Sequence, residues 1–126
     1  MTHDWPVKRG LSVHIVVYVP DTTGISKKIS KREHKKRARE VETELRKLFG
    51  GTTKVSSQGT WKHKKRVIRD GVLQVESFTT QRKWNKNDMV LKRYLQRKKK
   101  EWGQESLSYE WYDDSRELPF EGMHFL

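Results

Sequence analysis

The stretch that decides the fold is LSVHIVVYV, residues 11–19. Period-two alternation and many β-branched residues predict a strand with one buried face. Pro20 and the turn-forming residues after it end that strand. On the face expected to be buried lie Leu11, Val13, Ile15, Val17 and Val19, while Ser12, His14 and Tyr18 lie on the other.

A helix is predicted to follow this strand. Ser30, followed three residues later by Glu33, forms a capping box at its start, and the acid also suits the positive end of the helix dipole. Gly50 and Gly51 provide the conformational freedom that ends it. The apolar stripe expected to pack on the sheet, at spacings of three and four, comprises Ala38, Val41, Leu45, Leu48 and Phe49.

Two further strands are predicted over residues 52–61 and 72–80. The segment KHKKRVIRDG joins them and closes with Asp70-Gly71, a strong turn signal. We therefore expect a hairpin with a very basic tip.

A second helix is predicted to start near Asn87-Asp88 and to end at Gly103. Residues 106–112 then alternate again, with Leu107, Tyr109 and Trp111 on one face. The tail PFEGMHFL either adds a short final strand or packs over the core. The buried stripe of the helix is expected to comprise Leu91, Tyr94, Leu95 and Trp102.

The resulting order is β-α-β-β-α-β, which predicts an α+β ferredoxin-like sandwich: two helices on one face of a four-stranded antiparallel sheet. A chain of 126 residues is the usual size of one domain. We expect residues 1–10 to form a flexible arm and residues 11–126 to form a single domain.

The composition excludes several classes of protein. Hydrophobic residues make up 33% of the chain and charged residues 35%. The absence of cysteine rules out disulfides, thiolate zinc sites and a cysteine nucleophile, and fits a reducing compartment. No stretch reaches the roughly 18 to 20 apolar residues of a membrane span, and the first residues lack the apolar core of a signal peptide. We expect a cytoplasmic protein without a membrane partner.

The net charge of +12 and the isoelectric point near 10 point to a polyanionic partner, RNA or DNA. The basic residues crowd three stretches, and the sign reverses after Glu101. Phosphate contacts fix the position of a nucleic acid without reading its sequence. Solvated helix faces are the alternative explanation. The residues expected to contact phosphate are Arg32, Lys35, Lys36, Arg39, Lys62, Lys64, Lys65, Arg66, Arg69, Arg93, Arg97, Lys98 and Lys100.

The sheet face without helix cover offers a second candidate site. Strand parity places His14, Tyr18, Gln74, Glu76 and Glu110 there. A histidine beside carboxylates can perform acid–base chemistry or hold a divalent metal. Polar residues on such a face also need no function, so we predict no metal and no cofactor. We retain His14 and Glu76 of this face as catalytic candidates, together with Glu105 and His124, which would form a polar site with Glu76 and Gln104 if these residues converge in space.

Known motifs give little support to other activities. The chain has no GxxxxGK[ST], GxGxxG or HExxH motif, and the glycine-aromatic signature of RNA-recognition domains is missing from residues 72–78. Tyr18 and Trp61 are the candidates for base stacking. Asp21, directly after the first strand, is similar in place to the acid that ends the first strand in the ferredoxin-like nuclease of CRISPR adaptation. The sequence PDTTG itself favours a turn.

Six short motifs occur in an order that resembles a group of small, uncharacterised prokaryotic proteins with ferredoxin-like folds. The resemblance spans most of the chain and implies the fold and a prokaryotic or mobile-element origin. It implies no activity. The basic first helix and hairpin depart from the more acidic pattern of that group. The motifs are Tyr18-Val19-Pro20, Phe49-Gly50-Gly51, Gly59-Thr60-Trp61, Val75-Glu76-Ser77, Gly103-Gln104-Glu105 and Met123-His124-Phe125.

Three hypotheses for function result. The first is a non-catalytic nucleic-acid-binding protein, such as a small subunit of a nucleoprotein complex in antiviral defence or a CRISPR effector. The second is a metal-dependent nuclease or small hydrolase that uses the open sheet face. The third is a protein-interaction module or homodimer that binds no nucleic acid.

Overall fold

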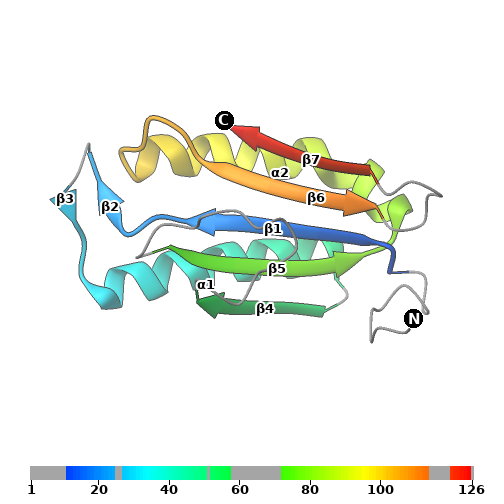
Figure 1. Ribbon diagram of the computed structural model, residues 1–126, viewed down its shortest axis with the longest axis horizontal. Helices are drawn as coiled ribbons and strands as arrows, with labels where there is room; N and C mark the ends of the chain where they lie inside the picture. The colour runs from blue at the N-terminus through cyan, green and yellow to red at the C-terminus, as the bar shows by residue number, and fades with distance from the viewer. Residues whose placement is uncertain (1–10, 25–26, 51, 58–71, 114–119, 126) are drawn as a thin grey trace.

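A computed structural model describes residues 11–24, 27–50, 52–57, 72–113 and 120–125; for residues 52, 56, 57 and 120–125 it describes the backbone alone. The predicted arm, residues 1–10, and the predicted basic hairpin tip lie outside these ranges. Figure 1 shows the elements in chain order. They are β1 (Val13–Val19), β2 (Thr22–Thr23), β3 (Lys27–Lys28), α1 (Lys31–Phe49), β4 (Thr52–Ser57), β5 (Leu73–Thr79), α2 (Gln81–Glu101), β6 (Ser108–Asp113) and β7 (Phe120–Phe125).

The main sheet has the strand order β4-β5-β1-β6-β7, and every pair is antiparallel (Figure 1). Strand β1 lies in the centre, between β5 and β6. Strands β4, β5, β1 and β6, together with α1 and α2, form the predicted ferredoxin-like arrangement. The tail adds a fifth strand, β7, which pairs with β6.

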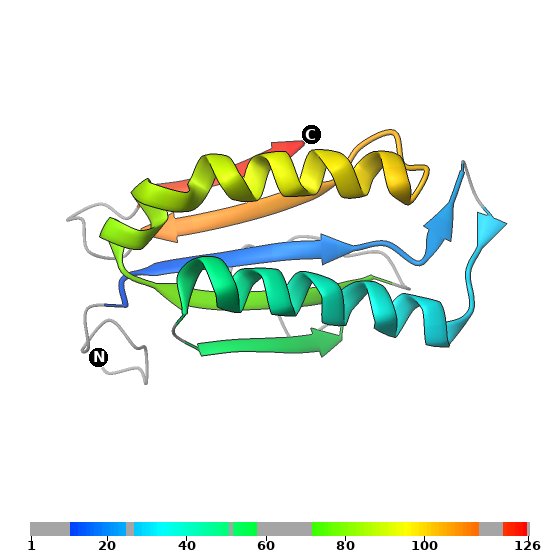
Figure 2. The same ribbon diagram turned by 180° about the vertical axis from the view of Figure 1, so that it is seen from behind.

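Both helices cover the same face of the sheet (Figure 2). The core lies between the helices and that face, because the alternating apolar side chains of β1 point towards the apolar stripes of α1 and α2. This confirms the predicted inward face of the first strand. The buried cluster includes Val13, Ile15, Val17, Val19, Ala38, Val41, Leu45, Phe49, Leu91, Leu95, Trp102, Leu107 and Tyr109.

The limits of α1 agree with the prediction from its caps. The hydroxyl of Ser30 accepts a hydrogen bond from the backbone N–H of Glu33 at 3.0 Å, which satisfies one of the free donors of the first turn. At the other end Gly50 has a φ of +62°, a conformation that favours glycine, and its N–H donates to the carbonyl of Arg46.

The predicted start of α2 was wrong, because the helix begins at Gln81 rather than near Asn87. Thr80 is its N-cap, and the Thr80 hydroxyl accepts a hydrogen bond from the N–H of Lys83 at 3.2 Å. Trp84 in the first turn packs between Phe49 and Trp111, with ring centroids 5.7 and 5.0 Å away. The burial of this large ring fixes the first turn against the sheet.

A small hairpin, β2–β3, lies between β1 and α1, where the sequence indicated only a turn. The buried guanidinium of Arg37 holds its base, because Nη1 donates to the carbonyls of Pro20 and Thr22 at 2.9 Å each. The same guanidinium lies over the ring of Trp102, 4.9 Å from the centroid. Arg37 therefore joins the hairpin to both helices.

Candidate functional site

The outward side of α1 is basic. Arg32, Lys35, Lys36 and Arg39, all predicted to contact phosphate, are exposed to solvent. At 3.6 residues per turn, Lys47 continues the same side towards the end of the helix, and it is also exposed. The sequence prediction omitted Lys47 because it lies beyond the dense basic stretch.

The outward side of α2 carries a second basic row. The predicted contacts Arg93, Arg97 and Lys100 are exposed, and so are Arg82 and Lys86, which the prediction missed. These two residues extend the row from Arg93 back to Arg82, about three turns, because α2 begins earlier than expected. Helical spacing from Arg93 would have identified both. We call the following residues of α1 and α2 the basic helix face: Arg32, Lys35, Lys36, Arg39, Lys47, Arg82, Lys86, Arg93, Arg97 and Lys100.

The acidic residues of the two helices are largely withdrawn from this face. Glu33, Glu40, Glu42, Glu44 and Asp88 are half-buried, and Glu101 is the one exposed acid within α1 and α2. Glu42 pairs with the exposed Arg46 on the same helix at 2.8 Å. Burial raises the pKa of Tyr94 in α2, and the charges of Glu44, Glu40 and Glu101 raise it further. These carboxylates therefore lie close to Tyr94 in the seam between the helices.

Lys98 belongs to this seam and differs from the other predicted phosphate contacts. Its ammonium lies 3.1 Å from the carboxylate of Glu40 on α1 and 3.2 Å from that of Glu101, and only 15% of its side chain is exposed. Burial lowers the pKa of Lys98, but the hydrogen bonds to the two carboxylates outweigh this effect, so its pKa is raised. We therefore assign Lys98 to the contact between the helices and leave it out of the basic helix face.

The remaining predicted contacts, Lys62, Lys64, Lys65, Arg66 and Arg69, lie outside the described residues, as does the stacking candidate Trp61. Within the described residues, the two helices carry all of the predicted phosphate contacts.

The sheet face opposite the helices is polar, as predicted, but it is not open to solvent. His14 and Gln74 are 1% and 0% exposed, and Glu110 is 0% exposed. His14 Nε2 lies 3.2 Å from Glu76 Oε1, and the imidazole stacks on Phe78 with centroids 4.2 Å apart. A buried histidine next to a carboxylate is a competent acid–base pair, but here solvent is excluded from it.

Tyr18, the second stacking candidate, also lies on this face. Its hydroxyl donates a hydrogen bond to the carboxylate of Glu110. Tyr18 is 9% exposed, so it offers little surface to a base. The Tyr18–Glu110 bond therefore connects β1 to β6 within the sheet.

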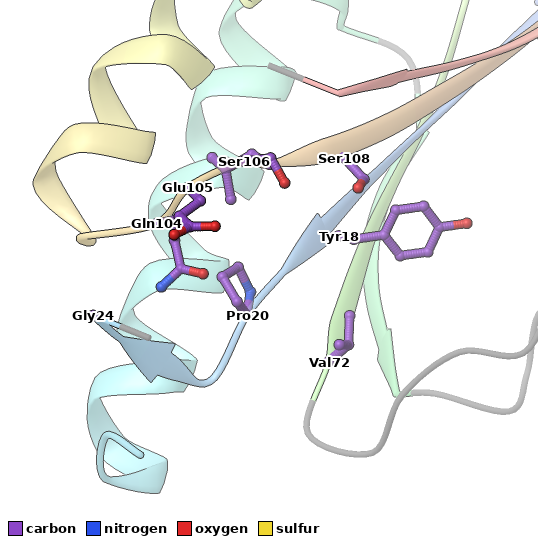
Figure 3. A pocket seen from close by; sticks show the side chains of 9 residues that line it. Tyr18, Pro20, Gly24, Val72, Gln104, Glu105, Ser106 and Ser108 are labelled. Atoms are coloured by element: carbon purple, nitrogen blue, oxygen red, sulfur yellow. The ribbon is translucent and has the colours of Figure 1, made fainter. Parts of the chain in front are cut away.

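A hollow of about 290 Å³ lies where β1 leaves the sheet (Figure 3). The catalytic candidate Glu105 lines it, together with Ser106 and Ser108. Gln104 also borders the hollow, but its amide donates to the carbonyls of Thr22 and Trp102 at 2.6 and 3.1 Å and so has a structural role.

The four catalytic candidates do not form one cluster. His14 and Glu76 pair within the sheet, whereas Glu105 follows α2 in the chain and lies at the hollow. His124 belongs to β7, where its backbone pairs with Tyr109, and its side chain lies outside the described residues. Among the side chains that the structure describes, no group of three or more histidines or acids can hold a metal ion.

Neither α1 nor α2 is apolar enough to cross a lipid bilayer, and they are the two helices in the described part of the chain. Comparison with protein-family models, with curated proteins and with solved structures finds no match to this chain. Any function must therefore be inferred from the geometry and charge of the chain itself.

Proposed function

We propose that this protein binds nucleic acid and contacts its phosphates through the basic helix face. One observation carries the proposal: two helices that lie side by side on one face of the sheet (Figure 2) have exposed basic residues along both of their outward sides, whereas Glu101 is the one exposed acid among the six acids of α1 and α2. A surface of this kind attracts a polyanion and releases its condensed counterions.

The electrostatics of the face favour a partner over simple solvation. Like charges crowded on one face repel one another, and this repulsion lowers the stability of the folded chain. A salt bridge on a protein surface would relieve it, but Arg32, Lys36 and Arg93 have no acidic partner among the described residues. Phosphates would supply that missing charge.

The contacts at this face are expected to be independent of sequence. Lysine and arginine side chains on phosphates set the position of a nucleic acid, whereas sequence is read at the base edges. The described part of the basic helix face has no cluster of amide or aromatic side chains that could read base edges. Asn85 and Gln96 are exposed on α2 as single amide side chains. We therefore expect affinity that depends steeply on salt and weakly on sequence.

The test compares two triple variants that remove the same amount of charge. One removes part of the basic helix face (Arg82→Gln, Lys86→Gln, Arg93→Gln). The control removes three exposed lysines elsewhere, two on the β2–β3 hairpin and one on β4 (Lys27→Gln, Lys28→Gln, Lys54→Gln). The affinity of each for a labelled oligonucleotide is measured by fluorescence anisotropy between low and moderate salt.

We expect the first variant to bind more weakly at every salt concentration. The slope of log affinity against log salt should fall by roughly 0.7 to 0.9 for each phosphate that is no longer neutralised, about two units or more in total. The control should keep a slope close to that of the unmodified protein. Equal weakening in the two variants would show that net charge alone, and not this face, attracts the ligand.

A further inference from the structure

The described aromatic side chains are buried, except that of Trp111 on β6, which is half-buried and packs against Trp84. Tyr18, Trp84 and Tyr94 are 9%, 4% and 7% exposed, and none of the exposed large hydrophobic residues is aromatic. Proteins that hold single strands stack successive bases on exposed aromatic rings. The basic helix face therefore offers charge without any ring on which a base could stack.

The charges on this face are arranged as two rows. From Arg32 to Lys47 the row on α1 extends about 22 Å, and from Arg82 to Lys100 the row on α2 extends about 27 Å, at 1.5 Å per residue. The helices lie side by side (Figure 2), and packed helices have axes about 8 to 10 Å apart. The Lys98–Glu40 contact crosses the seam and holds one row beside the other.

The separation of the rows is comparable to the grooves of a double helix, which are roughly 6 to 12 Å wide. Phosphates of two different strands border each groove, so both rows can bind phosphate at once. A single strand presents one line of phosphates, and bringing it into contact with both rows requires a bend that no base stacking would stabilise. The two-row geometry therefore favours a duplex.

We propose that the basic helix face selects double-helical over single-stranded nucleic acid, with the rows of α1 and α2 contacting the two strands across one groove. This inference rests on the proposed function. The shared chemistry is a pair of phosphate backbones, which duplex DNA and duplex RNA both supply.

The expected preference has a definite size. Each phosphate contact contributes a salt slope of about 0.9 with duplex DNA and about 0.7 with a single strand. For about five contacts the difference is one logarithmic unit at 0.1 M salt, which corresponds to roughly tenfold tighter binding of the duplex.

The experiment uses the full chain and four labelled probes of about 20 nucleotides: a DNA duplex, an RNA duplex, and one unstructured single strand of each kind. Two variants each neutralise three of the five basic residues in one row: Arg32→Gln, Lys36→Gln and Arg39→Gln on α1, or Arg82→Gln, Lys86→Gln and Arg93→Gln on α2. All six substituted residues are exposed, so we expect each variant to fold, and circular dichroism tests this before binding is measured.

We expect the unmodified protein to bind duplexes about tenfold more tightly than single strands. Either row variant should lose most of that preference, because removing about three of the five contacts lowers the difference from about one logarithmic unit to about 0.4, or roughly 2.5-fold. Binding to only one of the two duplexes also supports the inference, and it shows whether the ligand is DNA or RNA.

Other outcomes separate the two proposals. If single strands bind as tightly as duplexes while the row variants bind both more weakly, the proposed function stands and the duplex inference is wrong. A duplex preference that stays near tenfold in either row variant also overturns the two-row arrangement. If none of the four probes binds, both proposals fail.

Discussion

The ammonium of Lys98 on α2 lies 3.1 Å from the carboxylate of Glu40 on α1, so the two helices are joined by an ion pair across their seam. Glu101 contacts the same ammonium from the next turn of α2. Lys98, which the charge pattern predicted to contact phosphate, instead holds the two basic rows side by side.

A double-mutant cycle measures this contact. We expect Lys98→Met and Glu40→Gln to show a coupling energy of about 0.5 to 1 kcal/mol in urea unfolding, a modest value because 35% of the Glu40 side chain is exposed. Lys98→Met should also weaken nucleic-acid binding less than Arg97→Met does. Additive effects on stability would show that the pair does not hold the helices together.

Arg37 gives a second prediction, because a buried cation is difficult to replace. It is 3% exposed and donates to two backbone carbonyls. Arg37→Met leaves both carbonyls without that donor, and we expect the free energy of unfolding to fall by about 2 to 4 kcal/mol. Urea unfolding of the variant and the unmodified protein measures this difference.

Arg39→Met is the matched control for Arg37→Met. Arg39 lies on the same helix and is exposed, so its substitution should change stability by about 0.5 kcal/mol or less. Similar destabilisation in both variants would contradict the structural role of Arg37.

The sequence predicted the fold well because its local signals agreed with one another. The alternation in residues 11–19 predicted which side of β1 faces the helices, and Ser30 with Gly50 marked both ends of α1. The start of α2 was missed because Thr80 has no acid three residues later. Trp84, four residues after the cap, was the available signal.

The candidate site was less predictable, because the pattern of charges along the sequence does not show which charged side chains face solvent in the folded chain. Arg93 and Lys98 look alike in sequence, yet one faces solvent and the other faces Glu40. Likewise, parity placed His14 and Glu76 on one face of the sheet, but no local pattern showed that this face is shielded from solvent. Both properties depend on which elements pack together.

A pair of glycines gives a third prediction. Gly103 and Gly24 have φ values of +65° and +64°, so alanine is strained at both. At Gly103 a Cβ would also lie 3.0 Å from the backbone nitrogen of Gly24 and 3.1 Å from the hydroxyl of Thr23, whereas nothing lies within 4 Å of a Cβ at Gly24.

We expect Gly24→Ala to destabilise the protein by about 1 kcal/mol and Gly103→Ala by about 2 kcal/mol or more, because the second change also separates the β2–β3 hairpin from the end of α2. Thermal unfolding of the two variants gives the comparison. Equal destabilisation would mean that the close approach at Gly103 adds nothing to the backbone strain.

The pKa of Tyr94 leads to a prediction for alkaline solution. Burial and the carboxylates of Glu44, Glu40 and Glu101 hold this pKa above its ordinary value of 10.0, although Arg97 acts in the opposite direction. Above about pH 10 the unfolded chain loses the phenol proton and the folded chain keeps it, so the unfolded state binds fewer protons. Stability must therefore fall as the pH rises through this range.

Tyr94→Phe removes this contribution and should leave a flatter dependence of stability on pH. The limiting difference in slope is about 1.4 kcal/mol per pH unit, so near pH 11 the variant should have regained roughly 1 kcal/mol relative to the unmodified protein. Chemical unfolding at a series of pH values from about 8 to about 11 measures both curves. Because the lysines titrate alike in both proteins, their effects cancel in the difference. Parallel curves would show that the Tyr94 phenol ionises as readily in the folded chain as in the unfolded one.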